Sequence, residues 1–346
     1  MENIMTQNRA QKASIPMVFA NSKIASVVIQ IRMLTAWVTK FLLSFFILTN
    51  LFGCNASVYE KWSSGLLESH RLVGQIWDVR NQQFVDIDDF LQSLNVPYLL
   101  LGEKHDNPDH HRLQSLIVDH QLKQTSVDGV VFEMLDSNFR PVPALTDEPL
   151  NMDELKNRIG WEDDGWYWPF YEPLIKSAYN QDARILPGNL SDQEVSGIYA
   201  SQDFESPDAL SEASLARLTK DIDESHCGML PKSQFPSMLR VQRARDARMA
   251  EELTSNNYTG QMLLIAGNYH VRHDLGVPNY LIKGSSETVR DDIVSVAFLE
   301  VSVAKQKATD YEDGVAFEKA WDFIWFTPAV TSKDYCAQFK AGPTDN

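Results

Sequence analysis

The feature that most constrains the fold is a series of short apolar runs, each followed by polar residues and then by a stretch of helical pattern. The runs occupy residues 96–101, 129–132, 184–186 and 261–266. Strands that are apolar throughout and alternate with helices are typical of a parallel sheet that is covered on both faces. The sequence therefore predicts an α/β fold with a mainly parallel central sheet, helices on both faces and an additional helical subregion.

Other segments complete this pattern. Residues 74–79 and 83–85 predict a short hairpin, and residues 293–303 and 323–326 supply the last strands. Helices are expected at 86–94, from Pro108 onward, within 151–180, after Ser191, at 207–224 and at 233–255. We expect residues 74–330 to form one α/β domain, with a tether at 54–73 and a C-terminal tail at 331–346.

The first 53 residues are predicted to be a signal peptide. A lysine is followed by an apolar run that is too short for a comfortable membrane span and that ends in LFGC at 51–54. This ending resembles the lipobox of bacterial lipoproteins, so we expect a lipid on Cys54 and translation from Met33. The alternative is an uncleaved anchor helix. No Asp follows Cys54, which favours the outer membrane, with the protein facing the periplasm.

The overall charge and the missing motifs exclude several classes of function. The net charge is −16 and the chain has no basic run, so nucleic acid is not an expected partner. A Gly-x-Ser-x-Gly elbow and a P-loop are both missing, which argues against a serine hydrolase of the α/β type and a P-loop nucleotide enzyme.

Two cysteines, Cys227 and Cys336, follow Cys54 in the sequence. In an oxidising periplasm they could form one disulfide, and the alternative is two unpaired core cysteines. The sequence leaves both alternatives open.

Polar side chains follow four of the predicted strands. His105, Glu133, Asn189 and His270 each follow the C-terminal end of a predicted strand within a few residues. Because the C-terminal ends of parallel strands lie at one edge, where open α/β sheets bind ligands, we expect these side chains in one crevice. Glu103 is two residues before His105 and shares its side of the strand. Imidazole and carboxylate groups predict a metal site formed by His105, Glu133 and His270.

Each of these residues also has a structural interpretation. A hydrogen-bonded turn would explain His105, and a salt bridge to Arg245 or Arg272 would explain Glu133. We expect His273 to face solvent. On the helix at 233–255, Gln242 and Arg245 are expected to lock the helix to the sheet rather than line the crevice.

Several of these segments resemble the ChaN family of haem-binding, iron-regulated lipoproteins. The segments are GEKH at 102–105, FE at 132–133, HCGMLP at 226–231, QRARDARM at 242–249, GNYH at 267–270, DLGVP at 274–278 and WFTP at 325–328. The resemblance covers roughly residues 74–330. It implies haem binding between paired subunits with a tyrosine ligand, iron uptake at the outer membrane, and a TonB-dependent haem receptor system as partner.

The resemblance also directs attention to aromatic residues. Tyr269 is a candidate haem ligand, because phenolate binds ferric iron well, and His270 is adjacent to it. A dense aromatic patch would suit a porphyrin, although a small core or a subunit interface is an equal alternative. The patch consists of Trp161, Trp166, Tyr167, Trp168, Phe170 and Tyr171. Within it, Trp166, Trp168 and Tyr171 are the residues expected to bind haem.

Three hypotheses follow. The first is a haem-binding, periplasm-facing lipoprotein that acts in iron uptake as a homodimer. The second is a metal-dependent hydrolase of the wider Tiki-like group, in which His105, Glu133 and His270 hold a divalent ion that activates water and Glu103 is a ligand or base. The third is a lipoprotein whose crevice has lost both abilities. The family resemblance favours the first.

Overall fold

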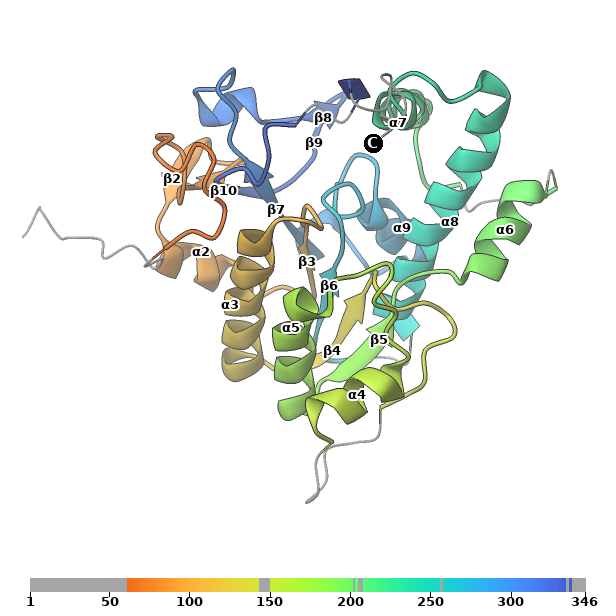
Figure 1. Ribbon diagram of the computed structural model, residues 1–346, viewed down its shortest axis with the longest axis horizontal. Helices are drawn as coiled ribbons and strands as arrows, with labels where there is room; N and C mark the ends of the chain where they lie inside the picture. The colour runs from red at the N-terminus through yellow and green to blue at the C-terminus, as the bar shows by residue number, and fades with distance from the viewer. Residues whose placement is uncertain are drawn as a thin grey trace, which may run out of the picture. The chain divides into compact units, whose positions relative to one another are not determined.

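An eight-stranded sheet organises the chain in the order β2-β1-β10-β7-β3-β6-β4-β5 (Figure 1). The computed structural model describes residues 61–142, 150–201, 203–204, 208–255, 258–333 and 336–337, so the expected signal peptide and Cys54 lie outside it. The strands are β1 (Ile76–Asp78), β2 (Gln83–Val85), β3 (Tyr98–Leu101), β4 (Val127–Phe132), β5 (Arg184–Pro187), β6 (Gln261–Ile265), β7 (Ile293–Glu300) and β10 (Phe323–Thr327).

Six neighbouring strands, from β10 to β5, are parallel, and only the β1–β2 hairpin at the edge is antiparallel. This confirms the predicted mainly parallel sheet. A second, two-stranded hairpin consists of β8 (Gly314–Val315) and β9 (Glu318–Lys319), which the sequence did not predict.

Helices cover both faces of this sheet. They are α2 (Ile87–Ser93), α3 (Pro108–Gln124), α4 (Met152–Ile159), α5 (Trp168–Asn180), α6 (Asp192–Ala200), α7 (Glu212–Ser225), α8 (Phe235–Thr254) and α9 (Val277–Gly284). The helices α3 and α5 pack on one face, and α8 and α9 pack on the other (Figure 1). No helix among the described residues is both long enough and apolar enough to cross a bilayer.

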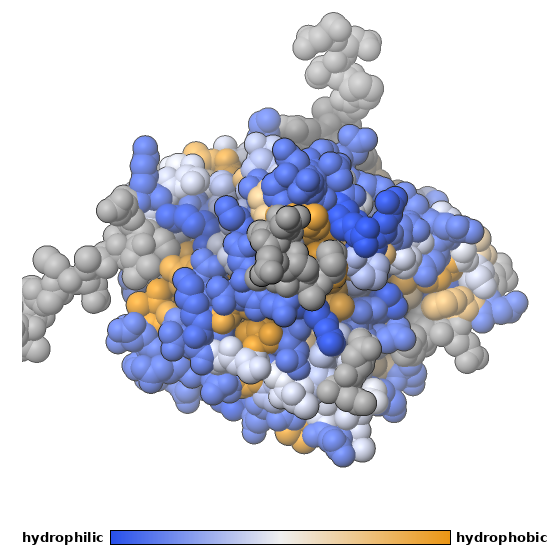
Figure 2. Space-filling view, turned by 90° about the horizontal axis from the view of Figure 1, so that it is seen from below, coloured by the Kyte–Doolittle hydropathy of each residue, from blue (hydrophilic) through white to orange (hydrophobic). Residues whose placement is uncertain are grey.

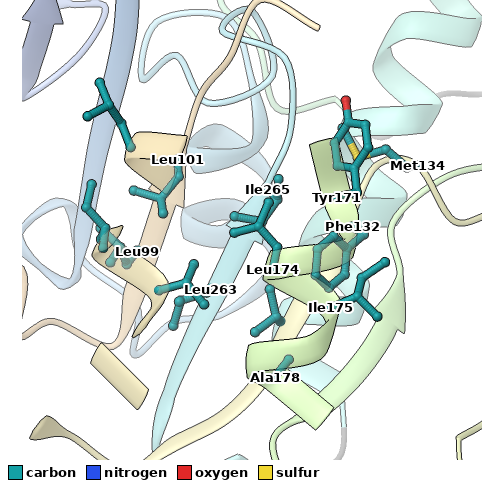
Figure 3. Packing of buried hydrophobic residues seen from close by; sticks show 14 of the residues in the cluster. Leu99, Leu101, Phe132, Met134, Tyr171, Leu174, Ile175, Ala178, Leu263 and Ile265 are labelled. Atoms are coloured by element: carbon teal, nitrogen blue, oxygen red, sulfur yellow. The ribbon is translucent and has the colours of Figure 1, made fainter. Parts of the chain in front are cut away.

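Successive residues of one strand enter two different cores. Leu99 and Leu101 of β3 point toward α5, whereas Leu100 between them belongs to the core under α8 and α9. Figure 3 shows the first of these cores, where β3 and β6 meet Leu174 and Ala178 of α5. This two-sided burial explains why the strands are apolar throughout rather than alternating. The face seen in Figure 2 is mostly hydrophilic, with hydrophobic residues in small separate groups.

The packed part of the chain begins before residue 74. The backbone N–H of Ser64 donates to Asp109 Oδ2 over 2.8 Å, and Leu72 is 1% exposed. Leu66 forms an antiparallel bridge with Ala329. Residues 61–73, which we assigned to a tether, are therefore held against the domain.

The C-terminal tail is also attached. Cys336 forms a disulfide with Cys227, and their Cα atoms lie 5.3 Å apart. Of the two alternatives that the sequence left open, the structure therefore has the disulfide. Part of the segment 331–346 is covalently joined to the turn that follows α7.

Candidate functional site

A pocket of about 880 Å³ lies at the C-terminal edge of the parallel strands. Its walls come from the loops after β3, β6 and β7, together with one side of α7. Glu103 and His105 line it after β3, and residues 267–270 line it after β6. This is the edge where the sequence predicted a crevice.

The first group in the pocket is a histidine held by a buried carboxylate. The Nδ1 atom of His105 lies 2.8 Å from Oε1 of Glu103, which also accepts a 2.6 Å hydrogen bond from the Tyr171 hydroxyl. The His111 Nδ1 atom lies 3.2 Å from the other oxygen of Glu103. Trp166 packs edge-on against the His105 ring at 4.9 Å. These contacts fix the orientation of the His105 imidazole.

Electrostatics keep Glu103 ionised. Burial alone would raise the pKa of Glu103, but the imidazoles of His111 and His105 hold it well below its usual range. Burial lowers the pKa of His105, but Glu103 and Glu133 outweigh this effect and raise it. Burial and the neighbouring Glu103 raise the pKa of Tyr171 far above its usual value, so its phenol stays protonated and donates to Glu103.

The second group is a buried imidazolium between two carboxylates. The Nδ1 atom of His270 lies 2.5 Å from Asp246 Oδ1, and its Nε2 atom lies 3.4 Å from Glu133 Oε1. Burial opposes the charge on His270, but the two carboxylates raise the pKa of His270 to about 10. Burial likewise opposes the charge on Glu133, but His270 lowers the pKa of Glu133 to about 2, helped by a 2.7 Å hydrogen bond from the Gly267 N–H. At neutral pH His270 is therefore a cation.

The two groups meet at Gly267. A Cβ atom at this position would lie 3.1 Å from His105 Nε2 and 3.6 Å from Glu133 Oε2. The prediction that His105, Glu133 and His270 converge is therefore correct. Asn189, however, does not join them: its amide donates to the backbone carbonyl of Glu133 over 2.9 Å and stabilises the loop instead.

The donor set does not fit a metal ion. Within the described residues, no group of three or more His, Cys, Asp or Glu side chains is arranged to hold one. Both ring nitrogens of His270 face carboxylates, Asp246 Oδ1 at 2.5 Å and Glu133 Oε1 at 3.4 Å. The predicted site of His105, Glu133 and His270 thus finds no support as a metal centre.

The expected exposure of His273 is wrong, and the alternative salt bridge between Glu133 and Arg272 is not formed. His273 is buried, and its Nε2 atom lies 2.7 Å from Asp322 Oδ2, because the loop after β6 folds back against the residue that precedes β10. Arg272 is paired with Asp274 and Asp313 rather than with Glu133.

Helix α8 also contributes to the site. Gln242 lines the pocket, and its amide nitrogen lies 3.3 Å from His270 Nδ1. It therefore forms part of the pocket wall, whereas we expected it to lock the helix to the sheet. Asp246, four residues later on the same face, is a site residue that the sequence reasoning missed. The sequence could have indicated Asp246 through its spacing of four residues from Gln242, which places both on the inward-facing side of the helix.

The aromatic residues divide between the pocket and the core. Tyr269 lines the pocket, is 52% exposed and lies over the guanidinium of the buried Arg272 at 5.6 Å. Trp168 and Tyr171 are 8% and 1% exposed, so they pack inside the protein and offer no free ring face to a porphyrin. Trp166 is half-buried against His105. The interpretation of the patch as a small core is therefore correct for Trp168 and Tyr171.

Comparison with known proteins identifies the family. Residues 92–281 match the family model described as haem-binding uptake, Tiki superfamily, ChaN. A solved structure of cofacial haem binding to ChaN of Campylobacter jejuni is 23% identical, with 72% of this chain and 95% of that chain covered and a TM-score of 0.55, which indicates a shared fold. An erythromycin esterase mutant in its open conformation is 11% identical, with 73% and 96% covered and a TM-score of 0.40. Among curated proteins none matches. This chain belongs to the ChaN family of the Tiki superfamily.

Proposed function

We propose that this protein binds haem in the pocket at the C-terminal edge of the sheet. The observation that carries the proposal is the composition of this pocket, in a chain that belongs to a haem-binding family. Its volume of about 880 Å³ is in the range of cofactor sites.

The pocket lining suits an amphipathic, flat ligand. Apolar side chains come from α7, the end of β7 and the segment before β10: Leu218, Ile222, Phe298, Leu299 and Trp321. Two lysines, Lys104 and Lys305, also line the pocket and could pair with the carboxylates of a porphyrin. The residues present therefore fit haem, unlike a bare metal ion.

Tyr269 is the residue that we assign to the haem iron. A phenolate is a suitable ligand for ferric iron, and the Tyr269 ring is half-exposed in the pocket. Burial raises the pKa of Tyr269, as does Asp221, while the Arg272 guanidinium under the ring opposes this rise. Both ring nitrogens of His270 are held by carboxylates, so we assign the iron to Tyr269 and give His270 the role of a buried cation that holds Glu133 and Asp246 in place.

The setting of this function is also part of the proposal. The lipobox at 51–54 supports a lipoprotein anchored through Cys54 to the outer membrane and facing the periplasm. There it would serve iron uptake together with a TonB-dependent haem receptor. The family resemblance leads us to propose a homodimer with haem between paired subunits, and the Campylobacter jejuni relative is described as binding haem cofacially.

A haemin titration followed by visible spectroscopy tests the proposal. We expect a saturable spectral change with the purified protein, and weaker binding with an altered spectrum for Tyr269→Phe. Tyr167→Phe is the matched control, because Tyr167 is 62% exposed but does not line the pocket.

Absence of a saturable change would contradict haem binding. If the untreated protein instead carried a divalent metal that His105→Ala removed, the metal-dependent hydrolase would become the better hypothesis.

A further inference from the structure

Helix α7 forms one wall of the pocket. Leu218, Asp221, Ile222 and Ser225 all line the cavity from this helix. The helix packs against α8 and β8 (Figure 1). In the chain it lies between α6 and α8, so neither neighbouring helix or strand in sequence is a strand of the large sheet. Whatever fixes α7 therefore also fixes this wall of the pocket.

Near its middle, α7 is held by a polar contact and by apolar packing. The guanidinium of Arg217 donates to both carboxylate oxygens of Asp313, over 2.7 and 2.5 Å. One residue later, Leu218 enters the core, followed by Ile222 one turn further on. Asp313 directly precedes the β8–β9 hairpin. These contacts therefore join α7 to the segment between β7 and β10 that contains this hairpin.

The C-terminal end of α7 is held differently. Cys227 and Gly228 both have a left-handed backbone, with φ of 59° and 69°, which turns the chain away from the helix axis. The backbone N–H groups of this turn donate to Glu224 and Asp223, within α7 itself. These hydrogen bonds end the helix, but they do not tie it to the sheet.

The disulfide supplies a link from this end to the sheet. Cys336 follows β10, and the intervening chain is attached at Val330, whose N–H donates to Glu300 at the end of β7 over 3.0 Å. Cys227 and Cys336 are 109 residues apart in sequence, so the bond connects the end of α7 with the part of the chain that follows β10. Glu300 also lines the pocket.

We propose that the Cys227–Cys336 disulfide is a redox-controlled clasp that holds α7 over the pocket and slows exchange of the bound ligand. In the dithiol form, the end of α7 keeps only its local hydrogen bonds and nearby packing, and the wall opens more often. The identity of the ligand as haem rests on the proposed function, whereas the effect on α7 does not.

The chemistry of the clasp requires a protein dithiol–disulfide oxidant of the exported compartment. A thiolate of Cys227 attacks the oxidant's disulfide and forms a mixed disulfide. The thiolate of Cys336 then displaces the oxidant, which leaves as a dithiol with the two electrons and two protons of the cysteine pair. A reducing compartment keeps both cysteines as thiols. The disulfide would thus form only after the chain reaches an oxidising compartment.

Hydrogen exchange measured by mass spectrometry tests the clasp. Oxidised protein, dithiothreitol-reduced protein and the Cys227→Ser/Cys336→Ser variant are compared, all with Cys54→Ser so that no third thiol takes part. We expect peptides from α7 to exchange about tenfold faster in the reduced and variant proteins, with β6 unchanged and no effect of dithiothreitol on the variant. Equal exchange in α7 would overturn the proposal. Loss of protection from exchange throughout the sheet would also overturn the proposal, because the disulfide would then stabilise the whole fold rather than α7.

A second measurement addresses ligand exchange. Ferric haem is loaded onto each protein, and its transfer to excess apomyoglobin is followed by absorbance. Without the disulfide we expect haem transfer to be about tenfold faster, which corresponds to a decrease of ~1.4 kcal/mol in the activation free energy of haem release. If haem binds but is transferred at the same rate with and without the disulfide, the clasp proposal is wrong and the haem-binding proposal is retained. If the oxidised protein binds no haem, the proposed function fails, and hydrogen exchange still decides the clasp.

Discussion

Two imidazoles at the same sheet edge are held in different ways because their surroundings differ. His105 contacts one carboxylate, that of Glu103, and its side chain is 42% exposed. His270 is instead buried between Glu133 and Asp246. A buried charge must be paired, so the second histidine and its partners form a unit in which each member needs the others. Gly267 lies against the His105 ring and the Glu133 carboxylate, and so adjoins both groups.

Gly267→Ala tests how tightly this arrangement is packed. The added Cβ would lie 3.1 Å from His105 Nε2 and 3.2 Å from its Cε1, so the imidazole must move. We expect a loss of about 1–3 kcal/mol in the free energy of unfolding and weaker haemin binding.

Gly197→Ala on α6 is the matched control for this change. A Cβ at Gly197 meets nothing within 4 Å, so this substitution should stabilise the helix by about 0.5–1 kcal/mol. Both effects can be measured by urea unfolding and haemin titration. If Gly267→Ala were as harmless as Gly197→Ala, the packing argument would be wrong.

Sequence reasoning found the site residues that follow strands and missed the one that does not. The positions of His105, Glu133 and His270 depend on where β3, β4 and β6 end, and a strand end is visible in the sequence. Asp246 comes from α8, and only the packing of that helix brings it to His270. The expected exposure of His273 was wrong because a residue beyond the strand takes its environment from the fold of its loop.

At the scale of elements, helix α3 shows how one residue can join several parts of the fold. Asn107 begins this helix: its Oδ1 accepts from the Asp109 N–H over 2.9 Å. Its amide also donates to Glu300 over 2.9 Å and to the Pro328 carbonyl over 3.2 Å. The sequence predicted the start of the helix from Asn107 and Pro108, but these distant contacts have no local signal.

Asn107→Ala should therefore cost more than the loss of an ordinary helix cap. We expect a decrease of about 2–4 kcal/mol in the free energy of unfolding, since buried hydrogen bonds to Glu300 and Pro328 are lost with the cap. Asn151→Ala is the matched control, because Asn151 caps α4 at an exposed position and should cost about 1 kcal/mol. Equal losses in urea unfolding would mean that the distant contacts of Asn107 contribute nothing.

The elements that the sequence did not predict are short. The hairpin of β8 and β9 has two residues in each strand, and α9 has eight residues, about two helical turns. Long apolar strands and long helices were predicted correctly, because burial on two faces or on one helical stripe leaves a repeated pattern. Elements of two residues leave no such pattern.

At the scale of the whole molecule, contacts between residues far apart in the sequence complete the domain. Leu66 pairs with Ala329, and Cys336 is bonded to Cys227. Contacts across such sequence separations depend on the finished fold, which is why the segments at 54–73 and 331–346 read as a tether and a tail. The same dependence left the disulfide undecided until the Cα atoms of the two cysteines could be placed.

The stability of the whole molecule should depend on pH through His270. Its pKa is about 10 in the folded protein and near 6.5 when unfolded, so its contribution is complete below about pH 6.5 and is lost as pH rises toward 10. Glu133 acts in the opposite direction: its pKa of about 2 means that its contribution is complete above about pH 4.5 and is lost as pH falls toward 2. Both describe largely one contact, so the two contributions are not additive.

We therefore expect the free energy of unfolding to fall by roughly 2–4 kcal/mol between pH 7 and 10 because of His270, in addition to the effects of other groups. His270→Gln should be less stable than the natural protein at pH 7 and should lack this part of the alkaline decline. His120→Gln is the control, since His120 lies half-buried on α3, away from the pocket lining, and should keep the full decline. Urea unfolding across this range measures all three proteins. An unchanged alkaline slope in His270→Gln would show that His270 is not held as a cation between Glu133 and Asp246.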